Sequence, residues 1–75
     1  MEGAIESLGE SAIPYLEKSL EYDRDAHIRA LAAEAIGFLG QQRSMGPLIV
    51  ALQDDSDVVR NAAAWALNQI HSLQI

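Results

Sequence analysis

Few side chains in this sequence are of the kinds that perform acid–base or metal chemistry. The histidines are His27 and His71, and the densest acidic run is Asp-Asp-Ser-Asp at residues 54–57. That run lacks the alternating ligand spacing, the glycine and the distal glutamate of a calcium-binding loop. The histidines belong to opposite ends of their predicted helices, so they are not expected to share a site. Neither a nucleophile triad nor a phosphate-binding glycine loop is recognisable, and we expect no catalytic residue, no metal ligand and no cofactor.

Composition narrows the class of protein further. The 75 residues carry 11 acidic and 5 basic side chains, a net charge of −6, which disfavours binding to nucleic acid or to an anionic membrane. There is no cysteine, the start shows no signal-peptide pattern, and no apolar run is long enough to cross a membrane. Hydrophobic residues make up 49% of the chain, and many of them are alanine, which suits closely packed helices. We expect one small helical domain located in the cytoplasm.

The sequence repeats itself at one spacing. Residues 4–9 read AIESLG, residues 35–40 read AIGFLG and residues 66–71 read ALNQIH, each starting 31 residues after the one before. Residues 25–29 (DAHIR) and 56–60 (SDVVR) show the same offset of 31. A fixed period of this size is the signature of stacked helical repeats.

Residues with strong local preferences indicate where the longer helix of each repeat begins and ends. Asp25 and Ser56 precede apolar positions with helical spacing, so their side chains are expected to accept hydrogen bonds from the first backbone N–H groups. Gly40 is expected to end the first longer helix in a left-handed conformation, and Gly9 to do the same one unit earlier.

The chain is therefore expected to form one domain over residues 1–75 with five helices. It divides into a half repeat (2–9), one helical hairpin (11–40) and a second hairpin (44–72). Pro14 and Pro47 are expected in the first turns of the shorter helices, where a missing N–H costs nothing. Positions three and four apart are expected to form the buried face of each longer helix: Ile28, Leu31, Ala32, Ala35, Ile36 and Leu39, then Val59, Ala62, Ala63, Ala66, Leu67 and Ile70.

Two arginines recur at unfavourable positions. Arg29 and Arg60 each fall in the first turn of a longer helix, where a cation opposes the helix dipole, and this suggests that each has an acidic partner. Asp25 precedes Arg29 by four residues and Asp57 precedes Arg60 by three, close enough to pair along the helix. Across units, Arg29 is also within reach of Asp54, Asp55 or Asp57. We expect a ladder of Asp–Arg contacts that holds successive units in register; the alternative is an exposed local ion pair contributing under ~1 kcal/mol.

These positions together form the pattern D-x-x-I-R-x-x-A-x-x-A-I-x-x-L-G, which resembles the HEAT-like repeat of the phycobilisome-lyase type. The first full copy matches at Asp25, Ile28, Arg29, Ala32, Ala35, Ile36, Leu39 and Gly40. The second matches at Ser56, Val59, Arg60, Ala63, Ala66, Leu67 and Ile70, with His71 in place of the glycine. The resemblance covers essentially the whole chain. It implies an all-α fold, an α-solenoid (a HEAT-like or ARM-type superhelix) of about two and a half helical hairpins.

The resemblance is compatible with three classes of function. The first is a non-catalytic scaffold that binds another protein. The second is a fragment or subunit of a phycobilin lyase or a related chromophore-handling factor. The third is a di-iron hydroxylase of the deoxyhypusine type, whose repeats carry a His-Glu pair directly after the arginine. Ala30-Leu31 and Asn61-Ala62 stand at those places here, so the third class is disfavoured.

The second helices of such repeats usually line the concave face of the solenoid. We expect a protein-binding groove there, built by Glu34, Gly37, Asn61, Trp65 and Asn68, because tryptophan is favoured at interface hot spots. Trp65 is alternatively a cover for the edge of the core. Gly37 in mid-helix costs ~1 kcal/mol relative to alanine, and it marks either a close approach of another backbone or ligand, or a tolerated defect.

The ends of the repeat stack are expected to be uncapped. Terminal repeats need polar outer sides, whereas the last helix has a wide apolar arc and the chain starts with half a repeat. The chain is therefore expected either to be part of a longer array or to cover its ends by forming a homodimer. The sequence as a whole favours a non-enzymatic scaffold whose partner is another protein, with self-association as the alternative to a longer array.

Overall fold

The computed structural model describes residues 2–40 and 42–74, with side chains described for residues 11–40 and 42–72. Four α-helices account for most of this part of the chain, and a short 3₁₀ turn, η1 (Gln42–Ser44), precedes the third of them. The helices are α1 (Glu2–Tyr22), α2 (Ala26–Leu39), α3 (Met45–Ala51) and α4 (Asp57–Gln74). The described residues contain no strand, so the all-helical prediction is confirmed.

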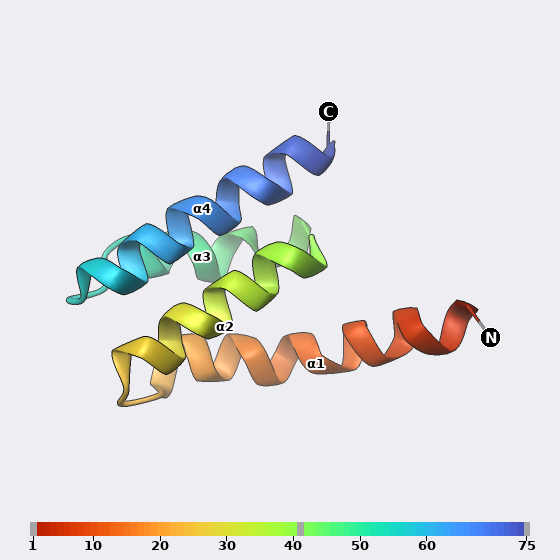
Figure 1. The fold of residues 1–75 in the computed structure, drawn as a ribbon, viewed down its shortest axis with the longest axis horizontal. Helices are drawn as coiled ribbons and strands as arrows, with labels where there is room; N and C mark the ends of the chain where they lie inside the picture. Colours follow the sequence, from red (N-terminus) through yellow and green to blue (C-terminus); the bar gives the residue numbers. More distant parts are fainter. Residues whose placement is uncertain (1, 41, 75) are drawn as a thin grey trace.

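The helices form two antiparallel pairs, α1 with α2 and α3 with α4 (Figure 1). The second helices of the two pairs, α2 and α4, pack against each other and run in the same direction (Figure 1). In the first pair the second helix is the shorter one, contrary to the prediction, because α1 extends over 21 residues and α2 over 14. Helix α3 lies behind them in this view and packs mainly on α4. The chain therefore places two consecutive helical pairs next to each other, in an envelope of 40 × 27 × 16 Å.

The prediction of five helices is wrong, because α1 is continuous from Glu2 to Tyr22. Gly9 lies inside α1 and does not end a helix, and Pro14 lies in its interior, not in its first turn. A helix of about eight residues rarely forms alone, since nucleation is costly and each added residue extends an existing helix cheaply. Residues 2–9 therefore join the following helix despite the glycine and the proline.

The predicted ends of α2 are confirmed. The Asp25 side chain accepts a hydrogen bond from the backbone N–H of His27 at 2.9 Å, which satisfies one of the unpaired donors of the first turn. Gly40 has φ 66°, the left-handed conformation that glycine adopts without strain, and its N–H donates to the Ile36 carbonyl. Helix α4 begins directly after Ser56, and Pro47 falls in the first turn of α3, as the sequence predicted.

The core lies where α2, α3 and α4 meet, with α1 covering α2. Twelve buried residues form it: Leu20, Ala30, Ala32, Ala33, Ile36, Leu48, Ala51, Val59, Ala62, Ala63, Ala66 and Ile70. The predicted inner face of α2 needs correction, because Ile28 and Leu31 are 42% and 62% exposed. Ala30 and Ala33 are buried in their place. These small side chains let α2 and α4 approach closely, which turns the larger apolar side chains of α2 outward.

Gly37 shows how close that approach is. A Cβ placed on Gly37 would lie 2.8 Å from the Cα of Ala66 and 2.9 Å from its Cβ, closer than van der Waals contact allows. Of the two explanations for a mid-helix glycine, the structure therefore favours close approach of another backbone, and that backbone is α4. The helix propensity lost at Gly37 is offset by this packing.

Candidate interaction site

An aromatic pair bridges α2 and α4 at the surface. The rings of Phe38 and Trp65 lie with their centroids 5.0 Å apart and their planes at 63°, an edge-to-face arrangement. Phe38 is 75% exposed and Trp65 is 37% exposed. Such pairs contribute about 0.5–1.5 kcal/mol beyond the area they bury, and this one presents a large, ordered apolar surface to the solvent.

The residues predicted to line a groove differ in their exposure to solvent. Glu34, Asn61 and Asn68 are exposed, as a binding face requires. Gly37 is buried beneath Trp65 and does not itself face the solvent. A Cβ placed on Gly37 would lie 3.0 Å from the ring atom Cζ3 of Trp65, so the absence of a side chain at Gly37 lets the tryptophan ring pack directly on α2. Phe38 was not among the residues predicted for the groove, although its place one helical turn after Glu34 puts it on the same side of α2.

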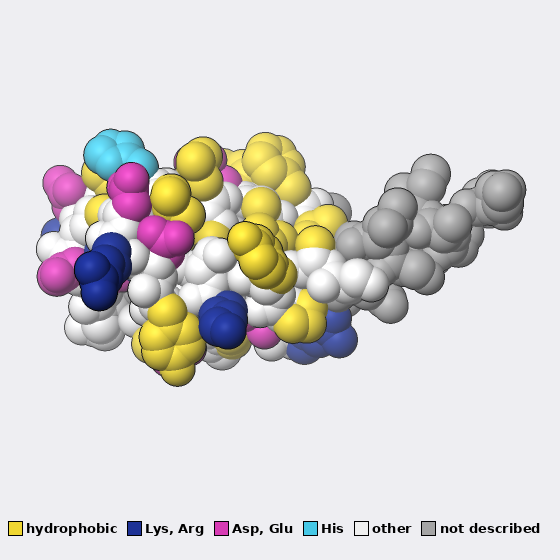
Figure 2. Space-filling model, turned by 90° about the horizontal axis from the view of Figure 1, so that it is seen from below, with side chains coloured by type: hydrophobic (Ala, Val, Ile, Leu, Met, Phe, Trp, Pro, Cys, Tyr) yellow, Lys and Arg dark blue, Asp and Glu magenta, His cyan; other side chains and the backbone are white. Residues whose placement is uncertain are grey.

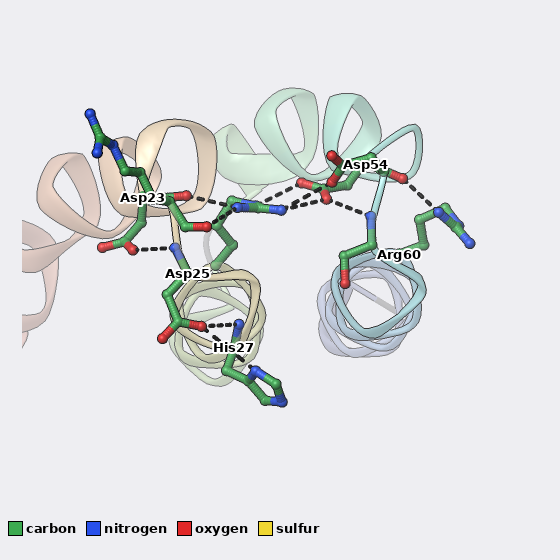
Figure 3. A network of polar contacts seen from close by, with 9 residues as sticks. Asp23, Asp25, His27, Asp54 and Arg60 are labelled. Atoms are coloured by element: carbon green, nitrogen blue, oxygen red, sulfur yellow. Dashed lines mark hydrogen bonds and ion pairs between the residues drawn. The ribbon is translucent and has the colours of Figure 1, made fainter.

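Arg29 makes the densest polar contacts among the described side chains. Its Nε donates to Asp54 Oδ2 at 3.0 Å and its Nη2 to Asp54 Oδ1 at 3.0 Å, a two-pronged pairing that fits the planar guanidinium. Nη2 also donates to Asp55 Oδ1 at 3.2 Å. The Arg29 and Asp54 side chains are only 13% and 14% exposed. The pair therefore joins the start of α2 to the turn before α4 (Figure 3).

The turns before α2 and α4 are built by the same hydrogen bonds, one unit apart. Asp23 Oδ1 accepts from Asp25 N and Asp54 Oδ1 accepts from Ser56 N, each at 2.9 Å. Arg29 Nη1 donates to the Asp23 carbonyl at 2.8 Å, and Arg60 Nη1 donates to the Asp54 carbonyl at 2.7 Å (Figure 3). Each partner in the second unit lies 31 residues after its counterpart in the first. The repeat in the sequence is thus a repeat in hydrogen bonding.

The residues predicted for the Asp–Arg ladder have different roles in the structure. Asp25 caps α2 and lies 3.6 Å from His27 Nδ1. Asp57 is exposed and is the first residue of α4. The hydrogen bonds of Arg29 go to the turn residues Asp23, Arg24, Asp54 and Asp55. The contact between units therefore runs through Asp54 and Asp55, two of the three carboxylates that the sequence placed within reach of Arg29.

The repeat pattern and the helix pairs agree with the comparison to known families. The model of the family described as HEAT repeats matches residues 2–68 of this chain. The chain belongs to the HEAT-repeat family. No curated protein matches it. HEAT repeats commonly mediate contacts between proteins.

The electrostatics of this HEAT-repeat protein centre on the same pair. The hydrogen bonds from Arg29 hold the pKa of the Asp54 carboxyl below its ordinary value, with the backbone N–H of Ser56 acting in the same direction against desolvation. The hydrogen bond with Asp54 in turn raises the pKa of Arg29. Both groups are therefore charged at neutral pH, and their attraction links the two units.

A hollow lies between α1 and α3. It encloses about 470 Å³ and is lined by Glu17, Leu20, Glu21, Pro47, Val50, Ala51, Gln53 and Asp54. Two of its acidic groups have structural roles: Asp54 binds Arg29, and Glu17 Oε2 accepts a hydrogen bond from the buried Ser44 hydroxyl at 3.0 Å. Ser44 thus anchors η1 to α1.

Among the described residues, no three histidine, cysteine, aspartate or glutamate side chains lie close enough together to hold a metal ion. None of the described helices is both long enough and apolar enough to span a membrane. The exposed hydrophobic side chains are interspersed with charged ones on the face seen in Figure 2.

Proposed function

We propose that this HEAT-repeat protein is a non-catalytic scaffold that binds another protein through the surface around Trp65. The observation that carries the proposal is the exposed Phe38–Trp65 pair, fixed in place by the close contact of Gly37 with Ala66. Rigid aromatic side chains at the centre of a contact supply most of the binding energy in protein interfaces. Because the pair is ordered before binding, little conformational entropy is lost when a partner covers it.

The neighbours of the aromatic pair suit the rim of an interface. Glu34, Asn61 and Asn68 are exposed and polar, and interfaces typically surround an apolar centre with polar, solvent-accessible groups. Glu34 adds a negative charge next to the rings, in a chain of net charge −6. The expected partner therefore presents an apolar side chain for the aromatic pair, with a basic side chain beside it.

The proposal includes the finer assignments predicted from the sequence. The parallel packing of α2 and α4 is the arrangement expected of two neighbouring units in an α-solenoid of the phycobilisome-lyase HEAT type, and the cytoplasm is the proposed location. The scaffold is favoured over a chromophore-handling role by the hollow between α1 and α3. Glu17 and Glu21 line that hollow, and carboxylates repel the propionates of a bilin.

Substitution of the tryptophan tests the proposal. The wild-type protein is used to isolate a binding partner, and the purified partner is then titrated against Trp65→Ala and Phe38→Ala. Loss of a buried aromatic anchor typically costs 2 kcal/mol or more, so we expect each variant to bind at least about 30-fold more weakly. Tyr15→Ala removes an aromatic side chain that is 73% exposed on α1, and this control should bind like the wild type. Equal affinity of Trp65→Ala and wild type, with helical content unchanged, would reject the proposed surface.

A further inference from the structure

One side of α2 carries apolar side chains that none of the described side chains covers. Ile28, Leu31 and Phe38 are exposed, and with the half-buried Ala35 they follow spacings of three, four and three residues, so they form one stripe along the helix. We call these four residues the α2 stripe. Isolated exposed apolar residues are normal, but a continuous stripe along one helix marks a surface that is covered by another.

The second unit shows what covers such a stripe. The positions 31 residues later than Ile28, Leu31 and Ala35 are Val59, Ala62 and Ala66. All three are buried, on the side of α4 that packs against α2 and meets Gly37. The cover is therefore the opposite side of the second helix in the preceding unit, where Ala30, Ala33 and Gly37 have short side chains. The α2 stripe corresponds to the side of α4 that is covered in this way, one unit earlier in the sequence.

The charged residues of the two turns follow the same rule: an Asp–Arg pair joins the two units, and its counterparts at the two ends of the stack have no such partner among the described residues of the other unit. Asp54 receives the guanidinium of Arg29. Asp23 is its counterpart 31 residues earlier, and its carboxylate accepts from Asp25 N. At the other end, Arg60 is the counterpart of Arg29, is exposed and donates through Nη1 to a backbone carbonyl. One end of the stack thus presents a carboxylate and the other a guanidinium, at matching positions.

We propose that a second copy of this chain docks on the α2 stripe, head to tail, so that the packing of α2 on α4 continues from one copy to the next. The docking side of α4 carries Asn61, Ala64 and Asn68, the counterparts of Ala30, Ala33 and Gly37. These side chains are exposed and uncharged, so their burial leaves no unpaired charge. Because Asn68 is larger than its counterpart Gly37, the two copies keep the order of contacts but lie further apart than α2 and α4 do. In this register Arg60 of one copy reaches Asp23 of the next, as Arg29 reaches Asp54 within the chain. The contact shares Phe38, Asn61 and Asn68 with the proposed partner surface, so a second copy and another protein are expected to compete for these residues.

A head-to-tail contact uses two different surfaces and does not close on itself, so it generates open chains. Two variants separate the surfaces. Leu31→Asp places a charge on the α2 stripe, and Ala64→Glu places one on the docking side of α4. Both replaced side chains are exposed, so both variants should keep the helical circular dichroism of the wild type.

Sedimentation equilibrium from micromolar to millimolar concentration tests the proposal with the full chain. We expect the average mass of the wild type to rise past that of a dimer, and each variant alone to remain monomeric. An equimolar mixture of the two variants should form a one-to-one dimer and stop there, since each supplies the surface that the other lacks. A monomeric wild type, a monomeric mixture, or dimers of Ala64→Glu alone would each overturn the proposal; the last outcome would indicate pairing of two α2 stripes.

Charge reversal tests the register of the same contact. Arg60→Glu should weaken association up to about tenfold, because its carboxylate would face that of Asp23 across the contact; Arg24, which stands at the position of Asp55, offsets part of this loss. The double variant Arg60→Glu, Asp23→Arg should recover most of that loss, since each contact then pairs opposite charges again. Association of Arg60→Glu as strong as that of the wild type would rule out the register.

Discussion

At the scale of single residues, Asp54 has the most demanding position. Its carboxylate accepts two hydrogen bonds from Arg29 and one from the N–H of Ser56, and its carbonyl accepts from Arg60. Sequence reasoning identified the arginine, because a cation in the first turn of a helix needs a reason. It did not single out Asp54, because the choice among neighbouring carboxylates depends on the conformation of the turn. Of the predicted groove residues, Gly37 proved to be buried, since spacing along one helix does not reveal how deeply its neighbour sits.

The pairing of Asp54 with Arg29 should make stability depend on pH in the acidic range. The hydrogen bond from Arg29 lowers the pKa of Asp54 in the folded state, while the unfolded chain retains a carboxyl pKa of ~3.9. The pair therefore stabilises the fold fully above ~pH 4, and this contribution is lost as the pH falls through the folded pKa. Urea unfolding at pH 7 and at pH 3 should show that Asp54→Asn loses less stability on acidification than the wild type does.

The matched control for this prediction is Glu21→Gln. Glu21 is an exposed carboxylate on α1, outside the contacts of Arg29, and its variant should show the wild-type loss on acidification. If Asp54→Asn and the wild type lost equal stability between the two pH values, the proposed role of the carboxylate would be wrong.

At the scale of elements, the ends of α2 and the start of α4 were predictable from sequence because capping residues act locally. Asp25 and Gly40 impose their conformations through hydrogen bonds a few residues away. The length of α1 was not predictable in the same way, because Gly9 and Pro14 disfavour a helix without forbidding it, and cooperativity favours extension. The rotation of α2 was missed for a related reason: burial of the small Ala30 and Ala33 depends on α4, whose approach the α2 sequence alone does not encode.

The close contact between α2 and α4 leads to a prediction about glycine. Gly37→Ala gains ~1 kcal/mol of helix propensity, but its Cβ would lie 2.8 Å from the Cα of Ala66, and such overpacking typically costs about 1–3 kcal/mol. The backbone of α4 has no flexible end to move aside, so the clash should outweigh the gain. We expect thermal or urea unfolding to show a net loss of about 1 kcal/mol or more.

Gly46→Ala supplies the matched control, because a Cβ at Gly46 in α3 would meet nothing within 4 Å. That variant should be as stable as the wild type or more stable, by up to ~1 kcal/mol. A Gly37→Ala protein as stable as the Gly46→Ala protein would show that α2 and α4 do not approach as closely as described.

At the scale of the whole molecule, a shift of 31 residues along the sequence relates the main features of the first unit to those of the second. The same turn hydrogen bonds, the same apolar stripe and the same arginine recur 31 residues apart, and the interaction surface lies where α2 and α4 meet. The all-helical fold and the repeat were predictable because the period is visible in the sequence. The number of helices and the exposed side of α2 were not predictable, because both depend on residues 2–9 joining α1 instead of forming a separate helix.

The packing of α2 on α4 is tested most directly by nuclear Overhauser contacts of the Trp65 ring in the unmodified protein. Trp65 is the one tryptophan of the chain, so its ring signals are readily assigned. We predict strong cross-peaks from these protons to the α-protons of Gly37 and to the ring of Phe38, both on α2. Cross-peaks confined to residues of α4 would contradict the account.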